Sequence, residues 1–148
     1  MKISTKGRYA LRMLIELAEN QGDGYLSLKE IADHQNISKK YLEQIIPTFN
    51  NSDILRTTRG IQGGYRLAKP ASDITVGDVL RTTEGPLAPV ACLEFDPIEC
   101  DRAQNCATLP MWKGLSEVIN NYLDSITIQD LLDQQKGSFC PDQDKKDP

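Results

Sequence analysis

Three of the four cysteines, Cys92, Cys100 and Cys106, lie within a stretch of 15 residues, and their thiols are the groups best suited to chemistry. Thiolates bind soft metals and undergo redox reactions. The intervals of seven and five residues between them match neither the paired C-x2-C spacing of zinc ribbons nor the ferredoxin pattern. The stretch therefore predicts a soft-metal site, and Cys140 is left open as a further ligand or a stray exposed thiol.

Few other residues could carry out a reaction. His34 is the only histidine, so a histidine-based dyad or a zinc enzyme has almost nothing to draw on. The sequence has no P-loop. Gly60, Gly63 and Gly64 fall in an expected hairpin turn rather than between a strand and a helix, which argues against a dinucleotide motif. The chain is therefore not expected to be an enzyme.

Charge is divided unevenly along the 148 residues, which suffice for one domain with its own core. Residues 1–70 contain 11 Lys or Arg against 7 Asp or Glu, whereas residues 71–148 contain 6 against 14. This asymmetry is typical of a basic contact surface joined to an acidic, solvated remainder. No apolar run is long enough for a membrane span and no signal peptide is evident, so a cytoplasmic protein is expected.

The apolar spacing of the first 50 residues predicts three helices. The first covers residues 4–20, the second begins with a capping box from Ser27 to Glu30, and Ser38 caps the third. Residues 34–37 are expected to form a tight turn, and Pro47 is expected to loosen the end of the third helix. This pattern indicates a helix-turn-helix, whose second helix has a polar outer face of Lys39, Lys40, Tyr41, Glu43, Gln44 and Thr48.

A hairpin is expected directly after this motif. Residues 54–59 and 65–68 are β-prone runs around a glycine-rich turn, which is the arrangement of a wing. Gln44, Arg56 and Arg59 carry donors that can read base edges, and cations on the helix and wing suit phosphates. The expected fold class is mainly α with a small β wing, with a winged helix-turn-helix domain over residues 1–84.

The rest of the sequence divides into three parts. Residues 85–107 bear the cysteines and lack periodicity, residues 108–134 form a dimerisation helix region whose last turn is capped by Thr127, and residues 135–148 are a polar tail. The long helix carries an apolar stripe of Trp112, Leu115, Val118, Ile119, Tyr122 and Ile126. A winged domain that reads DNA usually needs a second copy, so this C-terminal helix is expected to pair with its twin in a homodimer.

Nearly the whole chain resembles the Rrf family of bacterial winged-helix transcription regulators, which has IscR-, NsrR-, RirA- and CymR-like members. The resemblance is carried by residues 1–10 (MKISTKGRYA), 37–45 (ISKKYLEQI), 59–67 (RGIQGGYRL) and 74–79 (ITVGDV). It implies a homodimer on double-stranded promoter DNA. Together with the motif it gives a DNA-binding set of Ser38, Lys39, Lys40, Tyr41, Glu43, Gln44, Arg56, Arg59, Gly63 and Gly64.

The resemblance also implies an iron–sulfur cluster, [2Fe–2S] or [4Fe–4S], that Cys92, Cys100 and Cys106 hold and that purified protein can lack. IscR-like members have a histidine three residues after the third cysteine, where this chain has Leu109. NsrR-like members use an acidic residue where this chain has Arg8. The fourth ligand therefore stays open among Glu94, Asp96, Glu99, Asp101, Cys140 and an external small molecule.

These observations favour a dimeric transcription regulator that senses iron, redox state or nitric oxide through the cluster. Two alternatives stay open. One is a cluster-free, CymR-like repressor controlled by a protein partner or a thiol switch. The other is a redox or interaction module that binds no DNA.

Overall fold

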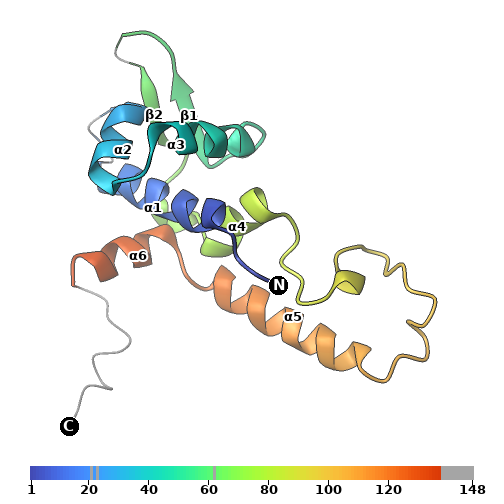
Figure 1. Ribbon diagram of the computed structural model, residues 1–148. Helices are drawn as coiled ribbons and strands as arrows, with labels where there is room; N and C mark the ends of the chain where they lie inside the picture. Colours follow the sequence, from blue (N-terminus) through green and yellow to red (C-terminus); the bar gives the residue numbers. More distant parts are fainter. Residues whose placement is uncertain (21, 23, 62, 138–148) are drawn as a thin grey trace.

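The computed structural model describes residues 1–20, 22, 24–61 and 63–137 and shows a mainly helical body with one hairpin (Figure 1). This architecture confirms the predicted fold class. Cys140 and the rest of the tail after residue 137 lie outside the described residues. The elements are α1 (Thr5–Glu19), α2 (Leu28–Gln35), α3 (Lys39–Ile45), η1 (Ile46–Phe49), β1 (Leu55–Thr58), β2 (Gly64–Leu67), η2 (Ala71–Asp73), α4 (Val76–Glu84), η3 (Ala91–Leu93), α5 (Leu109–Asp124) and α6 (Ile128–Gln135).

Side-chain caps fix where the helices begin, and they confirm the predicted starts. The hydroxyls of Ser4, Ser27 and Ser38 each accept a hydrogen bond from the backbone N–H three residues further on. Glu30 returns a bond to the backbone of Ser27, which completes the predicted capping box. The same box begins α4 and α6, at Thr75 with Asp78 and at Thr127 with Asp130.

The turn of the helix-turn-helix begins two residues later than predicted. α2 continues through His34 and Gln35, and the chain reverses at Asn36, whose φ of 53° is left-handed. Asparagine tolerates this region because its short side chain can bond locally. The expected effect of Pro47 is confirmed, since α3 ends at Ile45 and the chain continues as a 3-10 helix.

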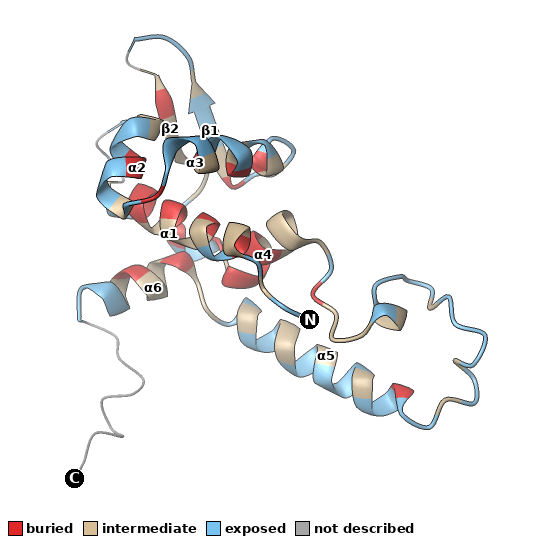
Figure 2. Cartoon of the chain, in the orientation of Figure 1, coloured by how far each residue is buried: buried red, intermediate tan, exposed pale blue. Residues whose placement is uncertain are grey.

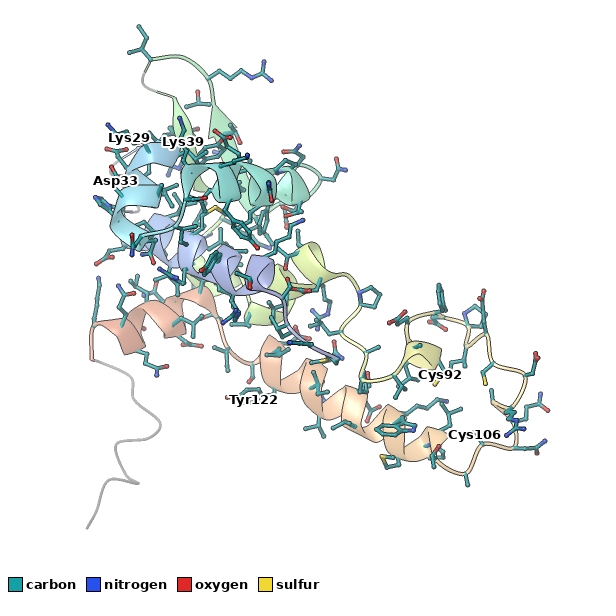
Figure 3. The ribbon with its side chains drawn as sticks, in the orientation of Figure 1. Lys29, Asp33, Lys39, Cys92, Cys106 and Tyr122 are labelled. Carbon is teal, nitrogen blue, oxygen red and sulfur yellow. The ribbon has the colours of Figure 1, made fainter. Side chains whose placement is uncertain are left out.

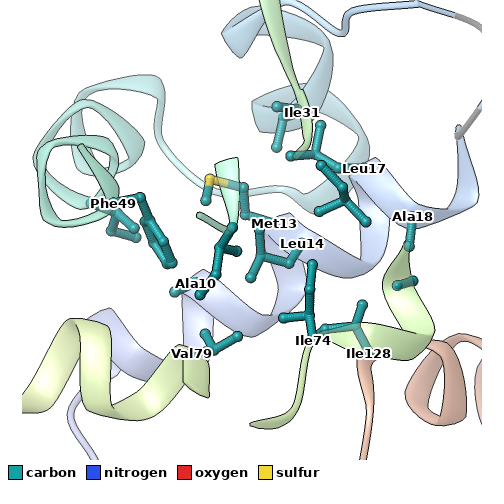
Figure 4. Packing of buried hydrophobic residues seen from close by; sticks show 14 of the residues in the cluster. Ala10, Met13, Leu14, Leu17, Ala18, Ile31, Phe49, Ile74, Val79 and Ile128 are labelled. Atoms are coloured by element: carbon teal, nitrogen blue, oxygen red, sulfur yellow. The ribbon is translucent and has the colours of Figure 1, made fainter. Parts of the chain in front are cut away.

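The core is built around α1 (Figure 4). Ala10, Met13 and Leu14 are fully buried on this helix, and residues of α2, α3, α4 and α6 surround them. Ile128 and Leu132 bring α6 into this core, although the sequence grouped that helix with the dimerisation region. The body that carries the helix-turn-helix therefore includes a segment from near the end of the chain.

The wing is attached to the body by its second strand. β1 and β2 are antiparallel, with Arg56 opposite Arg66. Tyr65 and Leu26 exchange two backbone hydrogen bonds of 2.7 and 2.9 Å. A Cβ at Gly64 would collide with the carbonyl of Leu26, so this close approach requires glycine.

α5 and the loop before it extend to one side of the body and are mostly exposed (Figure 2). Residues 88–108 contain no buried residue, and η3 is the one helix or strand within them. Ile126 follows the end of α5 and packs with Val76, Leu80 and Leu87. The prediction that Ile126 continues the apolar stripe was therefore wrong, because the helix ends two residues earlier.

Candidate functional site

The outer face of α3 is polar and cationic, as predicted. Lys39, Lys40, Glu43 and Gln44 are exposed, while the apolar residues of the helix are buried in the core. The hydroxyl of Ser38 is exposed at the helix start, where it accepts from Tyr41 N at 3.0 Å. The helix is thus held on one side and presents its hydrogen-bonding groups on the other.

Tyr41 departs from the predicted outer face because its ring is half-buried. It meets the ring of Tyr9 edge-on, with the ring centroids 5.3 Å apart. The guanidinium of Arg12 lies over the Tyr9 ring at 5.2 Å. Tyr41 therefore supports α3 on α1, and contact with DNA at this residue stays a prediction.

The wing carries two arginines on one face. Arg56 and Arg66 are directly opposite in the ladder, and cross-strand partners point to the same side of a sheet. Like charges in this arrangement repel. Arg66 stacks on the ring of Tyr25 at 5.6 Å, and no carboxylate among the described residues forms an ion pair with either guanidinium. The pair is thus placed to accept a polyanion.

The tip of the wing is open to solvent. Arg59 and Ile61 are exposed, whereas Gly63 is half-buried and Gly64 is buried. Gly64 has a packing role against Leu26, so contact of the two glycines with DNA remains a prediction.

The predicted DNA-binding residues come together at one end of the molecule, where α3 and the wing lie (Figure 3). Sequence reasoning missed Lys29, which is exposed in the first turn of α2 and lies at the same end as Lys39 in Figure 3. The first helix of such a motif crosses the DNA backbone, so the position of Lys29 at the start of that helix could have indicated a phosphate contact. Arg66 was expected among the cations on or beside the recognition helix and wing, and the register of the hairpin places it opposite Arg56.

His34 links the first helix of the motif to α1. The carboxylate of Glu16, which is 5% exposed, lies 2.5 Å from His34 Nδ1 and accepts from Gln35 Nε2 at 2.7 Å. This hydrogen bond to Glu16 raises the pKa of His34. The histidine thus helps to hold α2 against α1.

The three loop cysteines occupy different parts of the loop. Cys92 lies in η3 and Cys106 lies three residues before α5 (Figure 3). Cys100 is exposed in the loop between them. Among the described residues, no three His, Cys, Asp or Glu side chains are close enough together to hold a metal ion. The donor set suits iron because all three thiols can act as thiolate ligands. The structure does not bring the three together.

The thiol of Cys106 ionises more readily than an ordinary cysteine thiol. Its Sγ lies 3.3 Å from Thr108 Oγ1, and hydrogen bonds from Thr108 lower the pKa of the thiol. Leu109, at the position of the histidine ligand, is buried and apolar. Arg8 is exposed and donates to Thr5 Oγ1, so neither residue supplies a fourth ligand.

One face of α5 exposes large apolar side chains. Val118 and Tyr122 are 65% and 63% exposed, and Leu115 and Met111 continue the same face at helical spacing. Met111 was missed by the sequence analysis. A contiguous apolar patch of this kind marks an interaction surface.

A helix-turn-helix followed by a cationic hairpin, both on a helical body, defines the winged-helix class. Residues 3–134 match a family described as "Rrf2: Iron-dependent Transcriptional regulator". The chain therefore belongs to the Rrf2 family of transcriptional regulators.

Relatives and solved structures agree with this assignment. The HTH-type transcriptional regulator CymR of Bacillus subtilis (strain 168) is 40% identical over 137 residues, which cover 93% of this chain and 94% of CymR. The structure of CymR (YrzC), "the Global Cysteine Regulator of B. subtilis", aligns with a TM-score of 0.73, covering 90% of this chain and 98% of that one. The structure of T. potens IscR is 35% identical and aligns with a TM-score of 0.72, covering 95% and 93%.

These relatives are regulators, in line with the expectation that the chain is not an enzyme. Within the part of the chain that the structure describes, no helix is long and apolar enough to cross a membrane.

Proposed function

We propose that this protein binds double-stranded promoter DNA as a homodimer and adjusts that binding to a signal received by the loop cysteines. The observation that carries the DNA-binding part is the pair Arg56 and Arg66 on one face of the wing. The sensing part rests on the three thiols of one exposed loop.

In the proposed complex, α3 enters the major groove and the wing follows the backbone beside it. Gln44 can pair with adenine and Arg59 with guanine. Lys39, Lys40 and Arg56 suit phosphates, whose neutralisation releases counterions. All five side chains are exposed at the same end of the molecule.

A second copy of the chain is the proposed occupant of the apolar face of α5. Val118 and Tyr122 gain most from being covered, because they have the largest exposed fractions of the large apolar residues on this helix. A two-fold dimer through α5 would present two recognition helices to one duplex, as palindromic operators require.

Cys92, Cys100 and Cys106 are the proposed ligands of an iron–sulfur cluster. When bound, the cluster would make the protein sensitive to iron supply, oxidants or nitric oxide. The loop lacks buried residues, so it can draw its thiols together without breaking the core. Exposed carboxylates of the loop, at Glu94, Asp96, Glu99 and Asp101, are the nearest candidates in sequence for a fourth ligand.

A cluster-free thiol switch, alone or with a protein partner, is the second candidate. It is supported by the absence of three assembled ligands among the described residues and by the lowered pKa of Cys106. Two loop thiols would form a disulfide, passing two electrons to an oxidant and releasing two protons. The likeness to CymR adds to this candidate.

Anaerobic purification with iron and sulfide analysis separates the two candidates. A cluster gives visible absorption, and single replacement of Cys92, Cys100 or Cys106 by Ala should abolish it, while Cys140→Ala should keep it. Colourless, iron-free protein whose DNA binding is reversed by oxidant and restored by dithiothreitol would favour the switch. A salt-independent affinity for DNA would contradict the shared DNA-binding part.

A further inference from the structure

A polar cluster joins the winged domain to α5 beside the start of the cysteine loop. Arg81 of α4 donates from Nη1 and Nη2 to the two carboxylate oxygens of Asp124, at 2.9 and 2.8 Å. The same guanidinium donates from Nε and Nη2 to Asn120 Oδ1, at 3.3 and 3.0 Å. One arginine of the winged domain therefore holds two residues of α5.

Asn120 also holds the base of the loop. Its Nδ2 donates to the backbone carbonyl of Leu87 at 3.0 Å, and to that of Ser116 at 2.8 Å. Leu87 is buried against Val76 and Leu80, and no residue from 88 to 108 is buried. Leu87 is thus the last firmly packed residue before the cysteines, and Asn120 connects it to Arg81.

The fold makes room for this cluster. A Cβ at Gly77 would collide with Asp124 Oδ1, so the carboxylate can occupy this position only with glycine at residue 77. Mutual hydrogen bonding raises the pKa of Arg81 and lowers that of Asp124, so both partners stay charged. The bidentate contact of a planar guanidinium with a carboxylate has a fixed geometry. It is therefore suited to set the angle between α4 and α5.

Beyond Leu87 the loop is separated from the two helices by a cavity of about 750 Å³, to whose lining Arg81, Leu93, Asp96 and Asn120 contribute. The loop can therefore move toward or away from α5 without displacing the buried core. Such a movement reaches the winged domain first at Leu87, since the other end of the loop continues into α5 at Leu109.

We propose that Asn120 and Arg81 are positioning residues that transmit the state of the cysteine loop to the orientation of the winged domain. Displacement of the Leu87 carbonyl moves Asn120. The Oδ1 atom of Asn120 accepts hydrogen bonds from the Arg81 guanidinium, which connects α4 to α5. In a dimer held through α5, a change in this angle alters the spacing of the two recognition helices. This inference rests on the proposed function, because it describes how that function is regulated.

The test compares Asn120→Ala with Asn121→Ala, a matched control at the next, exposed residue of α5. DNA affinity is measured on a duplex that the wild type selects from a random pool. Each protein is assayed reduced and metal-free, then after anaerobic addition of ferrous iron and sulfide, and separately after oxidation with diamide. Of these two treatments, the one that changes the DNA affinity of wild type more is used to compare the variants.

We expect a tenfold or larger change in wild type and Asn121→Ala, and less than a twofold change in Asn120→Ala, with the dimer mass the same in all three. In the reduced, metal-free state, hydrogen–deuterium exchange should be faster over residues 85–93 in Asn120→Ala alone. If Asn120→Ala does not fold, Arg81→Lys, which keeps the cation but loses the fork, should show the same loss of response.

A full response in Asn120→Ala, or in Arg81→Lys where that variant replaces it, would overturn this inference alone. A wild type that binds the duplex equally in every state would overturn the sensing part of the proposed function and this inference with it. A wild type that binds no duplex would overturn the proposed function at its first step.

Discussion

In the winged domain α1 is surrounded by apolar side chains from α2, α3, α4 and α6, whereas residues 88–108 contain no buried residue. The close packing of its buried side chains restricts the conformations that the domain can adopt. The loop has few contacts that could fix it, and segments of this kind supply responsive elements in proteins. A closely packed domain is thus joined to a segment that has few contacts to hold its conformation.

α5 lies between these two extremes. Leu109 is its one buried residue, and its contact with α4 combines the polar cluster of Arg81, Asn120 and Asp124 with the half-buried Leu123. Polar contacts have fixed directions and apolar ones do not. The helix can therefore keep a defined angle to the domain without being part of its core.

The largest expected difference between the two regions is in stability. Leu14→Ala should lower the free energy of unfolding by about 3 kcal/mol, because it leaves a cavity beside a fully buried helix face. Phe95→Ala in the loop, where the ring is 56% exposed, should change it by less than about 0.5 kcal/mol. Urea unfolding at one protein concentration measures both, and equal decreases would contradict the contrast between core and loop.

The second prediction concerns the exposed face of α5. Val118→Asp should give monomer or aggregate, because an unpaired charge in an apolar interface costs several kcal/mol. Lys113→Asp is the control, since it places the same residue on an exposed part of the helix away from this face. Light scattering reports the mass, and an unchanged dimer in Val118→Asp would place the interface elsewhere.

The third prediction separates base reading from phosphate binding on the winged domain. Arg59→Ala should cost about 1 to 3 kcal/mol of binding free energy if Arg59 reads a guanine, and the cost should shrink on duplexes changed at that base pair. Arg56→Ala should weaken binding on all sequences and lower the salt slope by about 0.9 for each phosphate that the variant no longer neutralises. Lys113→Ala should leave the slope unchanged. A uniform decrease in affinity for Arg59→Ala would make Arg59 a phosphate-binding residue.

The features that could be predicted from the sequence are those that depend on residues close together in the chain. Helix starts at Ser27, Ser38 and Thr127 were predictable because the cap and the backbone N–H that donates to it lie within four residues. The wing followed from two β-prone runs around glycines. The thiols of the loop were equally visible as residue types.

Features that depend on distant partners were not predictable. The half-burial of Tyr41 requires Tyr9, which lies on another helix, and the place of Ile126 depends on α4. The assembly of α6 with α1 joins residues more than 100 positions apart. Ligand geometry in the loop was beyond reach for another reason, since no local pattern fixes a segment that buries nothing.

The smallest expected effect is a change of stability with pH that comes from the single histidine of the winged domain. The hydrogen bond to Glu16 raises the pKa of His34 above its ordinary value of 6.5. A raised folded pKa means that the charged histidine stabilises the fold fully below about pH 6.5, and that this contribution disappears as the pH rises through the folded value. The urea midpoint of wild type should therefore fall from pH 6 to pH 8 relative to that of His34→Gln, which keeps a donor but does not titrate.

Proton NMR of the single imidazole gives the folded pKa directly. A difference in urea midpoint between the two proteins that is the same at both pH values would show that the Glu16 contact does not depend on charge. Because this contact joins α1 to α2, the same titration measured in Phe95→Ala should be unchanged, as it must be if the loop and the domain core are physically separate.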